Sequence, residues 1–341
     1  MLTSMNDERF LVTGAGGCIG AWVVRTLLDE GSQVVAFDLS TDDRRLRQIA
    51  SAEMLARVRF VRGDISDAAA VGRTIADERI THIVHLAALQ VPFCRMDPVR
   101  GARVNVVGTV NVFEAALAHR EQVCGLAYAS SVAVFGPAEL YPGGAARDGS
   151  PLSPRTLYGV WKQANEWTAA TYARDHGMGS VGLRPCIVYG VGRDQGLTSG
   201  PTLAMLAAAA GHGYRIGFGG TSVYQLASDA AELFVAAARA AVADAEVVNM
   251  SGCAVAMPQV ISAIAAAAPA AANAIGFDNV PLPFPSALDA SGIERLLGPV
   301  TLTPFAEGVH RTIETFRMLL ARGLLRAPED TGTPSGGPGG E

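Results

Sequence analysis

The sequence predicts an α/β fold in which helices cover both faces of a parallel sheet and a smaller lobe follows. Short β-rich runs alternate with helix-like stretches through the first half, and these runs are continuously apolar, as in buried parallel strands. After Gly190 the alternation weakens, and alanine-rich helical stretches mix with glycine and proline. We therefore expect residues 1–189 to form a doubly wound domain and residues 190–326 to form the smaller lobe. Residues 327–341 have the glycine- and proline-rich composition of a disordered tail.

The elements of the first half follow from their residue patterns in chain order. A strand pattern is a short β-rich run, and a helix pattern repeats apolar residues three and four positions apart. The expected strands are residues 9–13, 33–37, 58–61, 80–86 and 123–129. The expected helices are residues 18–30, 41–50, 67–78, 98–119 and 154–176, with Gly31 at the end of the first helix. Right-handed crossovers wind such a series into a doubly wound sheet of the Rossmann type.

The composition excludes several classes of protein. Hydrophobic residues make up 49% of the 341 residues and charged residues only 17%, so a large folded core is expected. The net charge of −5 argues against a non-specific nucleic-acid binder, which normally carries a basic surface. No apolar run approaches the ~20 residues that a membrane-spanning helix needs, and residues 1–10 lack the pattern of a secretory signal. We therefore expect neither a nucleic-acid partner nor a membrane partner.

The cysteines indicate a reducing compartment. Five cysteines are an odd number, they are widely scattered, and they form no C-x-x-C pair. This spacing supports neither a disulfide framework nor a zinc site. The sequence therefore predicts a cytoplasmic protein without a bound metal.

A glycine-rich turn between the first strand and the first helix predicts a dinucleotide site. Residues 14–20 have the form G-x-x-G-x-x-G, which is weak evidence alone and stronger between a strand and a helix. Glycine permits the tight turn and the close approach of a pyrophosphate to free N–H groups at the helix N-terminus. The residues expected to contact the cofactor here are Gly14, Gly17, Cys18, Ile19 and Gly20.

The end of the second strand indicates which dinucleotide is bound. Asp38 lies 18 residues after Gly20, where its carboxylate can accept hydrogen bonds from the adenosine ribose. The same charge repels a 2′-phosphate, so NAD is favoured over NADP. Arg44 and Arg45 lie nearby and leave NADP open.

Further residues are expected along the same crevice. They follow the third and fourth strands, where a carboxylate can meet the adenine and small residues let the backbone approach the cofactor; they are Asp64, Ile65, Leu86, Ala87 and Ala88. His82 and His85 lie on the fourth strand itself. We interpret them as residues that fill a buried sheet rather than as metal ligands.

The chain contains a single lysine, Lys162, among 27 basic residues. An ammonium is a compact point charge, whereas a guanidinium is a wide planar fork, so the lone lysine suggests a chemical requirement. Tyr158 precedes it by four residues and shares its helix face. A positive charge near the phenol favours the phenolate, so we expect the pKa of Tyr158 to fall toward neutrality.

With these features, residues 9–240 resemble an extended short-chain dehydrogenase/reductase of the epimerase/dehydratase type. The resemblance includes the glycine turn, H-L-A-A at 85–88, N-V-V-G-T at 105–109, Y-A-S-S at 128–131, the Tyr158/Lys162 pair and R-P-C-I-V-Y-G at 184–190. It implies that Tyr158 is the catalytic acid/base, that Lys162 binds the nicotinamide ribose and tunes Tyr158, and that Ser131 holds the reacting oxygen. Ser130 is the alternative donor.

The resemblance also implies cofactor contacts and an assembly. Asn105 occupies the position of an asparagine in a long helix beside the cofactor, and Pro185 lies in a segment that borders it. Helices 98–119 and 154–176 resemble those that pair in dimers of this family. A homodimer is therefore expected.

Departures from the family pattern bear on the substrate. Residues 222–226, S-V-Y-Q-L, lack the arginine that holds a diphosphate in nucleotide-sugar epimerases, and Ile187 replaces an asparagine. Val132 and Ala133 follow Ser131, where dehydratases have acidic residues. The first hypothesis is therefore an NAD-dependent dehydrogenase that acts on a secondary alcohol of a small polyol, sugar or hydroxy acid. The alternatives are an NAD-dependent sugar or nucleotide-sugar epimerase and a non-catalytic dinucleotide sensor.

Candidate substrate contacts lie in both parts of the chain. The candidates are Gln90, Ser131, Thr156, Arg193, Tyr224 and Gln225. Arg193 is the most natural partner for a carboxylate or a phosphate.

Overall fold

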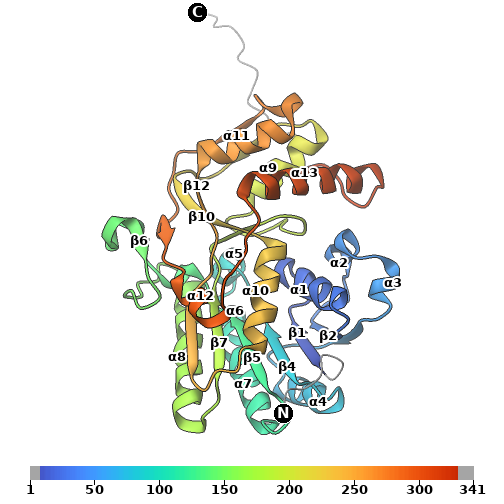
Figure 1. Ribbon diagram of the computed structural model, residues 1–341, viewed down its shortest axis with the longest axis vertical. Coiled ribbons are helices and arrows are strands. Elements are labelled where there is room, and N and C mark those ends of the chain that lie inside the picture. The colour runs from blue at the N-terminus through green and yellow to red at the C-terminus, as the bar shows by residue number, and fades with distance from the viewer. Residues whose placement is uncertain (1–7, 329–341) are drawn as a thin grey trace, which may run out of the picture.

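Seven parallel strands form the central sheet of the computed structural model, which describes residues 8–328 (Figure 1). Their order across the sheet is β11-β7-β5-β4-β1-β2-β3, and every neighbouring pair is parallel. The strands are β1 (Arg9–Thr13), β2 (Gln33–Asp38), β3 (Arg59–Arg62), β4 (His82–His85), β5 (Gly125–Ala129), β7 (Ser180–Arg184) and β11 (Ala245–Asn249). This order confirms the predicted doubly wound Rossmann sheet.

Helices cover both faces of this sheet. One face packs against α1 (Cys18–Asp29) and α10 (Ala227–Arg239), whose buried residues share one core with the strands. The other face packs against α4 (Ala68–Asp77), α7 (Gly108–Ala118) and α8 (Leu157–His176), and the rings of Phe113 and Tyr128 meet edge to face within that core. The two-sided burial explains why the strand sequences are continuously apolar.

Most expected elements are present, with different bounds. The helix expected at 41–50 begins later, as α2 (Arg44–Ile49), and is followed by the short α3 (Ala52–Leu55). The helix expected at 98–119 is divided into α6 (Pro98–Ala102), a π-helical segment (Arg103–Val107) and α7. The helix α8 begins three residues later than expected because Thr156 caps it: Thr156 Oγ1 accepts a hydrogen bond from the N–H of Gly159 (3.0 Å).

A second core lies at one end of the molecule, where Figure 1 shows α9, α11 and α13 gathered away from the sheet. The helices of this lobe are α9 (Gly200–Ala210), α11 (Met257–Ala267) and α13 (Phe305–Ala321). Its strands are β8 (Ile187–Tyr189), β10 (Thr221–Leu226) and β12 (Cys253–Ala256) in one sheet, and β9 (Tyr214–Ile216) with β13 (Ile275–Phe277) in another. The alanine-rich helices therefore form a packed core in the lobe, which helps to explain why hydrophobic residues make up 49% of the sequence.

The chain returns from the lobe to the central sheet. The helix α10 packs on the same face as α1, and β11 extends the sheet beyond β7, although both lie within the range 190–326. The remaining short elements are α5 (Val91–Met96), β6 (Ala145–Ala146), β14 (Ala287–Leu288), α12 (Ser291–Leu297) and four short 3₁₀ turns between residues 132 and 271. Of the expected disordered tail, residues 329–341 lie outside the described residues.

The topology places a crevice at the ends of two adjacent strands. The strand β1 pairs with β2 on one side and β4 on the other, so the sheet order reverses between β1 and β4. Ligands bind doubly wound sheets at this point, outside the carboxyl ends of the strands. The segments that follow Thr13 and His85 are therefore positioned for function.

Candidate active site

The glycine turn has the geometry of a dinucleotide cradle. A Cβ on Gly14 would lie 2.7 Å from the backbone nitrogen of Ala87, and a Cβ on Gly20 would lie 2.2 Å from the carbonyl oxygen of Gly14. The turn therefore closes only with glycine at these two positions. Gly17 is the N-cap of α1 and offers no side chain to cap it, while Cys18 and Ile19 of the first turn line the cleft. An uncapped helix N-terminus behind a glycine turn fits a pyrophosphate.

Asp38 fixes the shape of this turn. Its Oδ2 accepts a hydrogen bond from the N–H of Gly16 (3.0 Å), and its Oδ1 accepts one from the N–H of Ser40 (3.2 Å). The carboxylate still lines the cleft, as expected for a residue that meets the adenosine ribose. Of the two nearby arginines, Arg44 pairs with Asp42 and does not line the cleft, whereas Arg45 donates to the carbonyl oxygen of Gly16 (2.7 Å).

A buried hydrogen-bond network holds the end of β4. His85 Nδ1 lies 2.7 Å from Thr13 Oγ1, and His85 Nε2 lies 3.1 Å from Thr109 Oγ1. Thr13 Oγ1 also accepts hydrogen bonds from the N–H groups of Leu86 (3.2 Å) and Ala87 (3.3 Å), both of which line the cleft. Burial lowers the pKa of His85 to about 3, with a further contribution from the Lys162 charge, so the ring is neutral. His85 is therefore a structural residue of the sheet.

Asn105 supports the cleft from behind rather than lining it. Its Oδ1 accepts a hydrogen bond from the N–H of Leu89 (2.7 Å), and its Nδ2 donates to the carbonyl oxygen of Leu89 (2.9 Å). The side chain is almost fully buried and is absent from the cleft wall. Asn105 was expected to contact the cofactor directly. In the structure its amide instead forms two hydrogen bonds with the backbone of Leu89, which does line the cleft.

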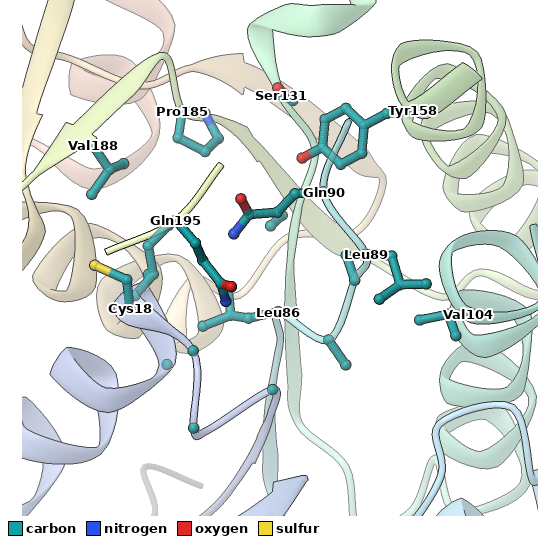
Figure 2. Close-up of a pocket in the computed structure, with 18 of the residues that line it drawn as sticks. Cys18, Leu86, Leu89, Gln90, Val104, Ser131, Tyr158, Pro185, Val188 and Gln195 are labelled. Atoms are coloured by element: carbon teal, nitrogen blue, oxygen red, sulfur yellow. The ribbon is translucent and has the colours of Figure 1, made fainter. Parts of the chain in front are cut away.

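Tyr158, Lys162 and Ser131 meet at the opposite end of the same cleft. Figure 2 shows the Tyr158 hydroxyl pointing into the cleft near Ser131 and Gln90. Lys162, one helical turn later, has its Nζ 5.6 Å from the centre of the Tyr158 ring and donates to the carbonyl oxygen of Ala129 (2.5 Å). The structure therefore brings the three expected catalytic residues together, across the cleft from the glycine turn.

Burial dominates the ionisation of this pair. It raises the pKa of Tyr158 to about 12, and a hydrogen bond with Ser131 and the charge of Arg193 offset only part of that effect. It also lowers the pKa of Lys162 to about 8. The prediction that the pKa of Tyr158 falls toward neutrality is therefore wrong for this geometry, because removal from water outweighs the charge of Arg193.

The two candidate serines have different partners. Ser130 is fully buried and donates to Glu166 Oε1 (2.5 Å), a carboxylate that also forms a two-pronged ion pair with Arg184 (2.8 Å for each contact). Ser131 accepts a hydrogen bond from the N–H of Ala133 (3.1 Å) and bonds with Tyr158. Ser131 is therefore the serine that lies beside Tyr158, whereas the hydroxyl of Ser130 is held by Glu166.

Residues 190–199, the covering loop, lie over the glycine turn. Trp22 Nε1 donates to the carbonyl oxygen of Val191 (2.9 Å), and Arg45 Nη2 pairs with Asp194 Oδ1 (2.7 Å). Figure 2 shows Gln195 beside Cys18 and Leu86, above the turn. The loop bends at three glycines with positive φ, Gly190, Gly192 and Gly196.

The cleft has a volume of about 480 Å³, within the usual range for ligand sites. It is lined by the expected residues Gly14, Gly17, Cys18, Ile19, Gly20, Asp38, Asp64, Ile65, Leu86, Ala87, Ala88, Gln90, Ser131, Tyr158, Lys162, Pro185 and Arg193. The sequence did not single out Leu89, Gln195, Leu197, Thr198 or Phe284, which also line it. The last four come from loops whose position depends on tertiary packing, so no local pattern marks them.

Three expected substrate contacts are not brought to the cleft. Tyr224 is buried in the lobe core, where its ring packs against Tyr189 and Phe305. Gln225 is buried and joins two backbone segments. Its Oε1 accepts a hydrogen bond from the N–H of Cys186 (2.9 Å), and its Nε2 donates one to the carbonyl oxygen of Met250 (3.1 Å). Thr156 is committed to capping α8 and is absent from the cleft wall. The hydrogen bonds or packing contacts of these three side chains therefore keep them out of the cleft.

Comparisons with known proteins agree with this geometry. A family model described as the NAD dependent epimerase/dehydratase family matches residues 10–251. The chain is similar to a UDP-glucose 4-epimerase of Mycolicibacterium smegmatis, with 31% identity over 323 residues that cover 91% of this chain and 98% of that protein. It is also similar to the structure of a Thermus thermophilus UDP-glucose 4-epimerase in complex with NAD, at 26% identity and a TM-score of 0.76, covering 91% and 99% of the two chains.

A further structural relative shows the fold alone. The L-threonine dehydrogenase of Clostridium difficile is 20% identical, with a TM-score of 0.78 and coverage of 94% of this chain and 99% of that one. Among residues 8–328, no helix is long and apolar enough to cross a membrane.

Proposed function

The chain belongs to the NAD-dependent epimerase/dehydratase family, and we propose that it oxidises a secondary alcohol of a small polar substrate, with NAD as the hydride acceptor. The observation that carries this proposal is the cleft itself, in which a glycine cradle at one end faces Tyr158, Ser131 and Lys162 at the other. NAD bound there supplies the site that accepts hydride. The cradle, Asp38 and Lys162 are the residues that hold it.

Side chains of the protein accept the proton of the substrate hydroxyl and stabilise the charge that develops during the reaction. Ser131 hydrogen-bonds the substrate oxygen, and the phenolate of Tyr158 takes the hydroxyl proton as the carbonyl forms. The ammonium of Lys162 stabilises the negative charge of that phenolate. Because burial raises the pKa of Tyr158 to about 12, the phenolate that oxidation requires becomes more abundant as the pH rises, and oxidation should speed up with it.

A small substrate is supported by the residues that replace nucleotide-binding groups. Ser222 stands where an arginine would hold a diphosphate, and it is 6% exposed within β10. Ile187, where an asparagine is expected, is fully buried in β8. Neither residue offers a charge-assisted contact to a phosphate. We assign substrate contact in the lobe to the covering loop and Phe284, which line the cleft, rather than to residues 190–326 as a whole.

The second candidate is an epimerase that oxidises its substrate and then reduces the ketone from the other face. The similarity to the M. smegmatis UDP-glucose 4-epimerase, which extends over 98% of that protein, favours it. The two candidates differ in one readout. A dehydrogenase accumulates NADH in proportion to substrate, whereas an epimerase converts substrate with no net NADH.

The test is turnover of a panel of polyols, aldoses, hydroxy acids and UDP-sugars by the wild-type protein and by Tyr158→Phe. We expect the variant to lose turnover by about 10²- to 10⁴-fold while it binds NADH as tightly as the wild type. Tyr172→Phe is the matched control, because Tyr172 lies on the same helix and bonds to Glu114 instead. Tight NADH binding without turnover of any compound would favour a non-catalytic dinucleotide sensor.

We further infer a cytoplasmic homodimer. Large apolar side chains stand exposed along α6, the π-helical segment and α8, namely Val99 (65%), Val107 (45%), Val160 (45%) and Trp167 (66%). A second copy of this chain would cover such a surface. The five cysteines are free, which suits a reducing compartment. Sedimentation equilibrium tests the assembly, since a mass of one chain at micromolar concentration contradicts a dimer.

A further inference from the structure

Two buried polar atoms at the catalytic end of the cleft have no hydrogen-bond partner within the part of the chain that the structure describes. They are Nε of Arg193, on the covering loop, and Oε1 of Gln90, at the start of α5. Both side chains line the cleft and both lie against Gly196. A Cβ on that glycine would be 2.0 Å from Gln90 Oε1 and 3.2 Å from Arg193 Nη2. Both atoms are closed off from the open cleft in this conformation, Gln90 Oε1 by Gly196. Because buried polar groups are rarely left unpaired, we expect the covering loop to shift at Gly196 and free both atoms for a ligand.

The charge of Arg193 also lacks a counter-ion. Its Nη2 donates to the neutral hydroxyl of Thr198 (3.1 Å), and among residues 8–328 it forms no ion pair. The carboxylates that line the cleft are Asp38, Asp42 and Asp64. Asp38 ends β2, and Asp42 and Asp64 follow β2 and β3, so all three lie at the end of the cleft where the adenosine is expected. The catalytic end, which holds Lys162 and Arg193, is therefore positively charged and suited to an anion.

We propose that the substrate is a hydroxy acid whose carboxylate binds Arg193 and whose second hydroxyl donates to Gln90. This inference rests on the proposed oxidation of a small alcohol and names its chemical class. A guanidinium presents a planar fork that matches a carboxylate, and Gln90 Oε1 accepts a hydrogen bond from a hydroxyl. Polyhydroxy acids, such as aldonic and uronic acids, carry both groups.

The subsite lies close enough to the reacting group to act on one small molecule. Figure 2 shows Gln90 beside Tyr158 and Ser131. The charge of Arg193 also lowers the pKa of Tyr158, which places the guanidinium within electrostatic range of the phenol. Because both side chains line one cleft, a single small molecule with its alcohol at Tyr158 can present its carboxylate to Arg193.

Matched pairs of compounds test the proposal by binding, independently of turnover. We compare D-galacturonate with D-galactose, and D-gluconate with D-glucitol, by titration calorimetry on the full-length protein saturated with NADH. We expect the acid of a pair to bind at least about tenfold more tightly than its neutral partner. Arg193→Gln should remove this difference and leave the neutral compound unchanged, and Arg193→Lys should retain part of it.

Controls separate the possible outcomes. Arg215→Gln removes an exposed lobe arginine paired with Asp278 and should keep the wild-type preference, and each variant's melting temperature verifies folding. Equal affinity for acid and neutral compound in the wild type overturns the inference. So does an Arg193→Gln variant that binds NADH more weakly but keeps the preference for acids, since Arg193 would then serve the cofactor pyrophosphate. Acid preference without turnover would contradict the proposed function and leave this subsite standing.

Discussion

Arg45 and Asp194 form an ion pair across the mouth of the cleft, with Nη2 2.7 Å from Oδ1. The same guanidinium donates from Nη1 to the carbonyl oxygen of Gly16, so one side chain ties the glycine turn to the covering loop. Trp22 makes a second tie through Val191. The loop is therefore held over the N-terminus of α1, and we expect it to open when a dinucleotide leaves.

Breaking this pair should speed cofactor release. Asp194 is 46% exposed and its pairing is screened by water, so Asp194→Asn should raise the NADH dissociation rate by about twofold to fivefold. Stopped-flow fluorescence of bound NADH measures that rate. Asp175→Asn, which breaks an exposed pair with Arg174 at the end of α8, is the control and should leave it unchanged. Identical rates in all three proteins would show that the tie does not limit release.

Asp38 should set the preference for NAD over NADP. Asp38→Asn keeps an oxygen that can accept from the N–H of Gly16 but removes the charge that repels a 2′-phosphate. We expect the ratio of NADPH to NADH dissociation constants to fall by about tenfold or more. Fluorescence titration measures both constants, with Asp29→Asn on the far end of α1 as the charge control. A ratio unchanged from the wild type would remove Asp38 from this role.

His85 should make the protein sensitive to acid. Its pKa is about 3 when folded and about 6.5 when unfolded, so between these values the unfolded chain holds one more proton than the folded chain. The free energy of unfolding therefore falls as the pH drops through that window, by about 1.4 kcal/mol per pH unit for this residue. His85→Gln cannot titrate and should show a correspondingly shallower loss in urea unfolding between pH 6.5 and 4. His310→Gln, exposed on α13, should keep the wild-type slope.

The buried pair of Glu166 and Arg184 should be costly to break singly. Their side chains are 6% and 5% exposed, and Arg184 also donates to the carbonyl oxygen of Asp148 (2.8 Å). Glu166→Gln leaves a buried guanidinium without its counter-ion, which should lower the free energy of unfolding by about 3–5 kcal/mol.

Replacing both partners of that pair with apolar residues tests the origin of the cost. Glu166→Leu combined with Arg184→Met should recover much of the stability, because no unpaired charge remains. Chemical denaturation measures each protein, and Asp278→Asn, in an exposed pair, should leave the midpoint in place. A double variant no more stable than Glu166→Gln would contradict this explanation.

Local spacing was enough to predict the parts of the site built on single elements. The glycine turn is set by residues within one strand–helix unit, and Tyr158 and Lys162 share a helix face because they are four residues apart. The parallel sheet follows from the continuous apolar strands, whereas the NAD-dependent family was indicated only by the resemblance of these motifs to those of its members. The pKa of Tyr158 could not be predicted in the same way, because it depends on how deeply the surrounding chain buries the phenol.

Contacts between distant segments could not be predicted from the sequence. Asn105 forms hydrogen bonds with the backbone of Leu89, and Gln225 joins the backbone of Cys186 to that of Met250. In each case the side chain is polar and lies near the expected site along the sequence. Only the packing of other elements determines that it faces backbone rather than ligand.

Because β11 returns to the central sheet and pairs with β7, the sheet cannot be completed by the first half of the chain alone. The strand β7 is buried along its whole length, and β11, more than sixty residues later, covers its outer side. A fragment ending near residue 190 would therefore present bare backbone N–H and C=O groups along β7. Such a fragment should self-associate through that edge, so the first 190 residues cannot be studied by simple truncation.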